Sequence, residues 1–328
     1  MNGNLKYSKA ILDGFKYLLS NHKEVFILGQ GLWSPWYVGA SMTDLDKIYG
    51  KDRIIDSPVS ELGITGAGVG AAISGKRPII VHPRIDFMLL AVDQIVNQAA
   101  KWRHMFGGKS SAPITIRGMI NRGGEQGAQH SQALHSWFAH IPGLKVVMPA
   151  TARDARDLLI ASVLSDDPVL YIDDRWLYDE EEEEESEIDL IPLHLQGPKI
   201  LKEGSDLTLV GVSYTTKLNL KAHEILTEQG YSVEVIDLRV INPLDYSLIV
   251  ESVKKTGRIC VVDGCWTNCG LAGEIIAGVC ERIEPVTLKA IPKRITLTDT
   301  PAPTSRILEG KYYIKIEDII NYIKSQLD

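Results

Sequence analysis

Short apolar runs alternate along the first half of the chain with longer segments in which apolar and polar residues mix at helical spacing. The apolar runs fall at residues 25–29, 77–82, 112–117, 144–149 and 168–173. They are rich in β-branched residues and apolar on both faces, as is typical of strands buried in a parallel sheet between two layers of helices. We therefore predict an α/β domain with a mostly parallel sheet between helices.

The same alternation returns in the second half of the chain. Apolar runs at 206–213, 231–239 and 258–264 are separated by helical patterns at 217–229 and 246–256, and further helical patterns follow at 271–282 and 316–326. Each helix-and-strand unit has about the length of a right-handed crossover between parallel strands. The pattern predicts a second α/β domain.

An acidic run separates the two halves. Asp179 is followed by six glutamates, Ser186 and Glu187. Like charges repel and such a segment cannot form a core, so we expect a solvated linker or an exposed excursion, with docking of a basic partner as the alternative. The predicted limits are 1–178 for the first domain, 179–195 for the linker and 196–328 for the second domain.

Composition narrows the functional classes. Hydrophobic residues make up 45% and charged residues 23%, as in globular proteins. The 35 basic and 42 acidic side chains leave a net charge of −7 without a basic cluster. This opposes binding to nucleic acid or to an acidic membrane. The amino-terminal residues lack the apolar core and cleavage site of a signal peptide, so we expect a cytoplasmic location.

Four cysteines fall close together, at Cys260, Cys265, Cys269 and Cys280. They do not form paired C-x-x-C spacings, and no histidine is near them in the sequence. Cys260 and Cys280 lie in apolar runs, where cysteine acts as a small hydrophobic residue. We expect neither a metal site nor a disulfide there.

A glycine-rich segment at 66–71, GAGVGA, matches the dinucleotide-binding pattern, with Asp86 about twenty residues on. That pattern requires a strand that runs directly into the first glycine, whereas Pro58, Ser60 and Glu61 precede this one. We therefore predict a small-residue helix at 63–74 that packs closely against a neighbour. Glu61 is either an ordinary carboxylate of a helical first turn or a functional acid.

Two further residues are candidates for chemistry. His130 lies in a glycine-rich polar loop at 118–132, where an imidazole can reach a ligand and transfer protons near neutral pH. A loop histidine that only bonds the backbone is an equal alternative. Phe87 opens a predicted helix at 86–108, after an apolar strand, where its ring can stack on a heterocycle. The other apolar residues of that helix are expected in the core.

Several blocks, in a fixed order, resemble the β subunit of the E1 component of 2-oxo-acid dehydrogenases. They are SPVSELGITGAGVGAA, IDFMLLAVDQIVNQAAKWRHMFGG, QHSQALHSWFAHIPGLKVVMPAT and DDPVLYID, followed in the second half by IDLRVINPLD and SVKKTGRICVVD. The resemblance covers nearly the whole chain. It implies a transketolase-like pyrimidine-binding domain followed by a transketolase C-terminal domain.

The resemblance also implies roles for single residues. Glu61 matches the acid that hydrogen-bonds the aminopyrimidine of thiamin diphosphate and favours the imino tautomer that takes a proton from the thiazolium carbon. Phe87 matches the aromatic residue that stacks on the pyrimidine. His130 matches the histidine that assists the 2-oxo-acid intermediate and acyl transfer to a lipoyl group. A potassium-binding turn of some members aligns with Ile114, Ser162, Val163, Ser165 and Asp167.

The partners follow from the same resemblance. The chain lacks the Gly-Asp-Gly segment and later Asn that usually hold the diphosphate and Mg²⁺. We therefore expect an E1 α-like subunit to supply them in an α2β2 heterotetramer, and we expect contact with a lipoyl acyltransferase.

Three segments depart from the family pattern. They are Gly29–Leu32 with the following Trp33–Trp36, then His82–Arg84, and Gly264 with Cys265. The first two favour a rival function, a two-chain transketolase-like or acyloin-forming transferase that moves a two-carbon unit between small molecules. The QHSQ block favours the dehydrogenase. A non-catalytic scaffold is the third alternative, which the joint presence of Glu61, Phe87 and His130 opposes.

Overall fold

The computed structural model describes residues 4–34, 36–183 and 187–327, which form two compact units. The first unit contains the chain up to Asn121 together with Trp137–Gln196, and the second contains Arg122–Ser136 together with the chain from Gly197 onward. The predicted domain limits differ from these units by the segment Arg122–Ser136 and by residues 179–196, which belong to the first unit. In the described part of the chain, no helix is both long and apolar enough to cross a membrane.

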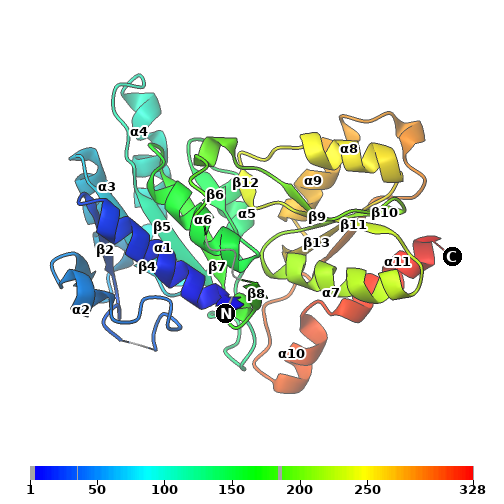
Figure 1. The fold of residues 1–328 in the computed structure, drawn as a ribbon, viewed down its shortest axis with the longest axis horizontal. Helices are drawn as coiled ribbons and strands as arrows, with labels where there is room; N and C mark the ends of the chain where they lie inside the picture. The colour runs from blue at the N-terminus through cyan, green and yellow to red at the C-terminus, as the bar shows by residue number, and fades with distance from the viewer. Residues whose placement is uncertain (1–3, 35, 184–186, 328) are drawn as a thin grey trace. The chain divides into compact units, whose positions relative to one another are not determined.

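The first unit is built on a parallel sheet, drawn from blue to green in Figure 1. In spatial order its strands include β6 (Lys145–Val147), β7 (Val169–Asp174), β5 (Thr115–Ile120), β4 (Arg77–His82), β2 (Val25–Gly29) and β3 (Ile54–Asp56). Most of their side chains are buried, so the predicted α/β fold is confirmed. β5 begins three residues later than predicted because Pro113 has no N–H to donate to a ladder.

Helices cover this sheet. They are α1 (Tyr7–Asn21), α2 (Leu45–Tyr49), α3 (Glu61–Ile73), α4 (Ala100–Met105) and α6 (Ala152–Val163), with 3₁₀ turns at Arg175–Leu177 and Leu193–Leu195. The short α5 spans His135–Ala139. α1 packs along α6, whose amino terminus is capped by the Thr151 hydroxyl accepting from the Asp154 N–H at 3.1 Å.

The predicted helix at 63–74 is confirmed as α3. A Cβ on Gly68 would lie 2.6 Å from Cδ1 of Ile80 and 3.0 Å from Cδ1 of Ile114, so only glycine lets the helix approach the sheet this closely. Residues 57–60 separate β3 from α3. This is not the direct strand-to-glycine entry that a dinucleotide site requires.

The predicted helix at 86–108 is confirmed over Phe87–Met105, but it is not a regular α-helix. The segment is a 3₁₀ turn at Phe87–Ala91, a π-helical stretch at Gln94–Ala99 and then α4. An apolar stripe specifies which face is buried but does not distinguish hydrogen bonds to the third, fourth or fifth residue. π-Helical stretches are frequent at functional sites.

The first half of the acidic run has no buried residue, in agreement with the predicted exposure, but part of it is a paired strand and not a linker without structure. Glu181–Glu183 form β8, which pairs antiparallel with β1 (Asn4–Lys6). The charge is compensated because Glu182 accepts a hydrogen bond from the Ala152 N–H, at the amino terminus of α6, at 3.0 Å, and because Lys6 pairs with Asp179 at 2.5 Å. The run's residues 184–186 lie outside the described residues.

The second unit is the predicted second α/β domain, drawn from yellow-green to red in Figure 1. Its sheet has the order β14 (Lys293–Leu297), β13 (Ile259–Trp266), β10 (Leu207–Gly211), β11 (Val233–Asp237), β9 (Lys199–Lys202), parallel except for β9. The remaining elements are β12 (Val240–Asn242), α7 (Tyr214–Glu228), α8 (Ser247–Thr256), α9 (Leu271–Cys280), α10 (Arg306–Tyr312), α11 (Ile316–Leu327) and a 3₁₀ turn at Pro285–Thr287.

Polar contacts explain why Arg122–Ser136 belongs to this second unit. Arg122 donates from Nη1 to the carbonyl of Gly264 at 2.8 Å, and the Glu125 N–H donates to the carboxylate of Glu309 at 3.1 Å. A Cβ on Gly264 would lie 2.7 Å from Nη2 of Arg122. The unusual glycine at 264 therefore makes room for this guanidinium.

Candidate active site

The carboxyl edge of the first unit's sheet gathers the candidate residues of that unit. β2, β4 and β7 are parallel members of one sheet, so their carboxyl ends face the same side. Ligands of open α/β sheets bind outside this edge. Phe87 follows β4 by five residues, and Glu61 begins the helix that leads into β4.

Glu61 is the first residue of α3 and is 4% exposed. The helix dipole favours an acidic side chain at this position. The apolar side chains beside it are not buried, since Val59 is 74% and Leu62 50% exposed. The Glu61 carboxylate is therefore nearly buried, next in the chain to the exposed apolar side chains of Val59 and Leu62.

His82 connects this helix to the end of β4. Its Nε2 lies 3.1 Å from the hydroxyl of Thr65, one turn after Glu61 on α3. Burial lowers the pKa of His82 to about 4, so the ring is neutral at pH 7. His82 thus positions the first turns of α3 against the strand, a role that the sequence pattern did not reveal.

Phe87 opens the 3₁₀ turn after β4 and is half-buried. α3 packs against this turn, so the helix that carries Glu61 and the turn that carries Phe87 are neighbours. A nearly buried carboxylate and a partly open aromatic ring fit an aminopyrimidine, which needs one hydrogen bond at its ring nitrogen and a flat surface for its face.

His130 lies in the second unit, on the segment Arg122–Ser136, and is half-buried. Its backbone N–H donates to the carbonyl of Gly127 at 3.4 Å. Gly127 has a φ of +72°, and a Cβ there would lie 2.7 Å from Oγ1 of Thr304. The loop is therefore ordered by a tight turn against the second unit, and its histidine remains a candidate for proton transfer.

A buried polar cluster lies on the same segment. Nε2 of His135 is 2.9 Å from Oδ1 of Asp263, and the Ser136 hydroxyl donates to the Cys265 sulfur at 3.5 Å. The donor atoms of His135, Asp263 and Cys265 lie within 4.8 Å of one another. The sequence interpretation of the cysteines missed this because the histidine is 128 residues from Asp263.

The thiols of this region are free. All four cysteines are unpaired, and burial raises the pKa of the Cys265 thiol to about 12. A protonated thiol is a poor nucleophile. Because His135 and Asp263 already bond each other directly, we interpret the cluster as internal support for the loop that carries His130.

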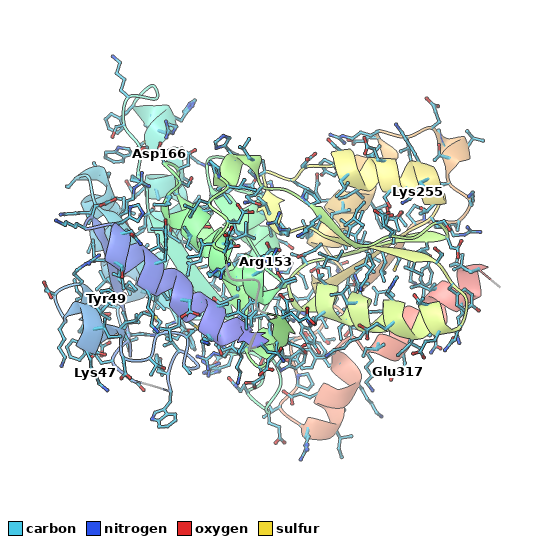
Figure 2. The ribbon with its side chains drawn as sticks, viewed as in Figure 1. Lys47, Tyr49, Arg153, Asp166, Lys255 and Glu317 are labelled. Atoms are coloured by element: carbon cyan, nitrogen blue, oxygen red, sulfur yellow. The ribbon has the colours of Figure 1, made fainter. Side chains whose placement is uncertain are left out.

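The proposed potassium turn is organised by an arginine. Arg77, at the start of β4, donates from Nη1 to the carbonyls of Val163 at 3.0 Å and Ser165 at 2.8 Å, and from Nη2 to Asp166 at 2.7 Å. Asp166 is labelled in Figure 2. Two of the carbonyls that a potassium ion would need are therefore bound by a guanidinium.

The remaining residues of that turn are also engaged. The carbonyl of Ile114 accepts from the Val169 N–H at 2.9 Å, and the carbonyl of Ser162 accepts from the Ser165 N–H at 3.2 Å. Asp167 accepts from Arg103 at 2.5 Å and pairs with Lys145 at 3.2 Å. In this arrangement the residues do not fit a potassium ion, because protein cations and N–H groups occupy its ligands.

Family comparisons cover nearly the whole chain. Residues 4–179 match the model of the transketolase pyrimidine-binding domain, and residues 198–319 match that of the transketolase C-terminal domain. One solved structure, a split gene transketolase described as an inactive beta4 tetramer, superposes with a TM-score of 0.76 over 99% of both chains, at 20% sequence identity. That likeness supports the fold.

Curated relatives are more similar in sequence. The chain is 39% identical to the mitochondrial pyruvate dehydrogenase E1 component subunit beta of Dictyostelium discoideum over 322 residues, covering 96% of this chain and 89% of the relative. It is 37% identical to the beta subunit of acetoin:2,6-dichlorophenolindophenol oxidoreductase of Cupriavidus necator, covering 95% and 94%.

Proposed function

Since the chain belongs to the E1 β family of thiamin-diphosphate enzymes, we propose that it is the β subunit of a 2-oxo-acid dehydrogenase E1. In this proposal it supports oxidative decarboxylation of a pyruvate-like 2-oxo acid and transfer of the acyl group to lipoamide. The observation that carries it is the nearly buried Glu61 on a helix packed against the turn of Phe87.

Bound thiamin diphosphate supplies a nucleophilic carbon that adds to the substrate carbonyl. The residues of this chain then have distinct roles. The Glu61 carboxylate holds a proton at the pyrimidine ring nitrogen, Phe87 fixes the ring plane, and His130 moves a proton or stabilises charge at the reacting oxygen. His82 is a positioning residue, because its bond to Thr65 fixes the first turns of α3.

A partner chain is part of the proposal. The chain has no Gly-Asp-Gly segment for the diphosphate and Mg²⁺, so we assign both to an E1 α-like subunit of an α2β2 heterotetramer. Val59, Leu62 and Leu90 support this, since they are 74%, 50% and 66% exposed beside the Glu61 and Phe87 elements. Exposed apolar groups of this kind mark protein interfaces. A lipoyl acyltransferase is the proposed acyl acceptor.

The second candidate function is a two-chain transketolase-like or acyloin-forming transferase. It is favoured by the segments that depart from the family pattern, Trp33–Trp36 and His82–Arg84, at the carboxyl edge of the sheet. In that case a small carbonyl compound, rather than a lipoyl group, accepts the two-carbon unit.

Reconstitution separates these candidates. The chain is purified with its α partner, thiamin diphosphate and Mg²⁺, and 2-oxo acids are assayed with and without a lipoyl domain. Acyl-lipoyl product that requires both chains supports the dehydrogenase. Ketol or acyloin product at a rate independent of the lipoyl domain supports the transferase, and a complex that never binds thiamin diphosphate contradicts both.

A cytoplasmic location is also proposed. The four free thiols support it, because reducing compartments keep cysteines unpaired. Fractionation of cells with an antibody to this chain tests the location.

A further inference from the structure

The two segments of the first unit that depart from the family pattern, Trp33–Trp36 and His82–Arg84, contribute residues to one pocket. Its volume is about 270 Å³. The lining residues are Ser34, Trp36, Tyr37, Pro83, Arg84 and Arg175. They come from three loops, which follow β2, β4 and β7 at the carboxyl edge of the sheet. Segments about fifty residues apart, each unusual on its own, therefore build one surface.

The loop after β2 brings aromatic side chains to the pocket. Gly31 has a φ of +70°, and any side chain there would collide with the ring of Tyr37. This turn lets Tyr37 fold back, while Trp36 is 83% exposed and Tyr37 44% exposed at the pocket wall. Exposed aromatic rings offer contact area for the carbon skeleton of a ligand.

The opposite wall carries two arginines. Arg175 donates to the backbone carbonyl of Tyr37 and approaches the sulfur of Met119 at 3.9 Å, and neither group is negatively charged. Its buried Nε has no hydrogen-bond partner among the described residues. Burial, and then the charge of Arg175, lowers the pKa of Arg84, whereas Asp86 acts in the opposite direction. Arg84 and Arg175 thus bring two guanidinium groups to one pocket.

Arg117, in the same sheet, is an example of a buried arginine whose charge is fully neutralised by a carboxylate. Arg117 on β5 is fully buried, and it donates to both oxygens of Asp173, at 2.9 and 2.8 Å. Among the described residues no carboxylate forms such a pair with Arg175. A guanidinium fork without a carboxylate has the geometry to bind an external carboxylate or phosphate.

We propose that this pocket binds an anionic group, a carboxylate or phosphate, at the far end of a small-molecule substrate, with Arg84 and Arg175 as specificity-determining residues. The inference rests on the proposed function, since it describes the substrate of that site. A pocket of about 270 Å³ is smaller than most ligand sites, so it receives one end of a molecule whose carbonyl lies elsewhere. Trp36 and Tyr37 pack on the carbon chain between the two ends.

A preference among substrates follows. A 2-oxo acid or carbonyl acceptor with a second negative group gains two charge-assisted contacts that pyruvate lacks. Each such contact contributes about 1.5 kcal/mol or more, which corresponds to about a tenfold change in affinity. Dicarboxylic or phosphorylated compounds are therefore the expected substrate class.

Binding is measured first, without turnover. The assembled complex with thiamin diphosphate and Mg²⁺ is titrated with inorganic phosphate and with succinate, by isothermal calorimetry. We expect both probes to bind the wild type and to bind the Arg84→Gln, Arg175→Gln double variant at least about tenfold more weakly. Arg306→Gln, which removes an exposed arginine of the second unit, is the matched control and binds as the wild type does.

Arg175 also donates a hydrogen bond to the Tyr37 carbonyl, so its loss could weaken the fold. A second variant therefore separates loss of binding from loss of folding. Arg175→Lys keeps the charge but not the planar fork, and we expect intermediate affinity with an unchanged thermal unfolding midpoint. Equal affinity of wild type and double variant for both probes overturns the proposal. So does an absence of binding to the wild type.

Kinetics then identify the source of the anion. With a dicarboxylic or phosphorylated substrate, the double variant should raise KM about tenfold or more, and the ratio of kcat/KM for this substrate to kcat/KM for pyruvate should fall by a similar factor. An equal loss of lipoyl-domain acylation from pyruvate would assign the pocket to an acidic protein and overturn the small-molecule proposal. Anion binding by a complex that turns over no 2-oxo acid or ketol donor would instead reject the proposed function.

Discussion

The two ends of β4 carry arginines in opposite settings. At the amino end, Arg77 is surrounded by acceptors, the carbonyls of Val163 and Ser165 and the carboxylate of Asp166. After the carboxyl end, Arg84 shares a pocket with Arg175, and Nε of Arg175 has no hydrogen-bond partner among the described residues. The first arrangement satisfies a cation internally and stabilises the fold. In the second, the Arg175 guanidinium has no carboxylate partner among the described residues and can bind a ligand, beside the elements that hold Glu61 and Phe87.

The largest expected effect is the loss of turnover when Glu61 is replaced. Replacing Glu61 with Ala should lower turnover of the assembled complex by about 10³-fold, because the proton at the pyrimidine nitrogen is no longer held. The measurement is steady-state kinetics with a saturating 2-oxo acid. The variant's α2β2 assembly is checked by size exclusion, and activity above a tenth of the wild type would mean that Glu61 does not act on the cofactor.

At the amino end, Arg77→Met should affect stability more than chemistry. Two carbonyls and Asp166 lose a charged donor, which costs about 3 kcal/mol of unfolding free energy. Denaturant unfolding of the complex measures it. Potassium chloride should restore part of the loss, since the vacated carbonyls can then accept an ion, whereas choline chloride should not.

The wild type is the control for this experiment, and its response to potassium is compared with its response to choline. Its stability and activity should respond to potassium chloride no more than to choline chloride of the same ionic strength, because Arg77 already occupies the carbonyls. A specific potassium activation of the wild type would show that the ion binds despite the guanidinium.

Protonation of His82 should change the free energy of unfolding by a smaller amount, which depends on pH. Its pKa is about 4 in the folded protein and about 6.5 in the unfolded chain, so the unfolded state binds the proton more readily. The stabilising effect of the neutral ring is complete above pH 6.5 and declines as the pH falls toward 4. At pH 5 the loss is about 2 kcal/mol. Unfolding curves of wild type and His82→Gln from pH 8 to 5 should differ in slope, and parallel curves would contradict this.

The smallest effect on stability and activity is expected from breaking an exposed ion pair. Lys47, labelled in Figure 2, pairs with Asp44 at 2.5 Å on an exposed helix of the first unit. Exposed ion pairs are screened by solvent and contribute little. Lys47→Ala should leave the unfolding midpoint and kcat/KM unchanged, and it serves as the reference against which the Arg77 and Glu61 variants are judged.

Local patterns in the sequence predicted the fold well. The strands at 25–29 and 77–82 agree with β2 and β4 to the residue, because apolar runs buried on both faces end at clear glycine and proline signals. The hydrogen-bond type within 86–108 was not predictable, since one apolar stripe is compatible with several helical spacings. Strand β8 was missed because its pairing with β1 is a non-local contact.

The site was predictable only in part. Glu61, Phe87 and His130 are candidates from their local sequence, but their proposed roles come from the family resemblance, because a single acid, ring or imidazole has no pattern of its own. Contacts between distant residues could not be predicted from spacing, such as Arg77 with Ser165, 88 residues apart. The joining of Trp36, Arg84 and Arg175 in one pocket depends on the parallel order of β2, β4 and β7, which apolar periodicity does not specify.

The most direct test of the account is the exchange of the thiazolium C2 proton of thiamin diphosphate with deuterium, followed by NMR in the assembled complex. The account predicts rapid exchange with wild-type chain and exchange slowed by about 10²-fold or more with Glu61→Gln, at unchanged cofactor occupancy. Equal exchange rates in the two complexes would show that Glu61 does not control this proton, and that the catalytic acid must be sought elsewhere.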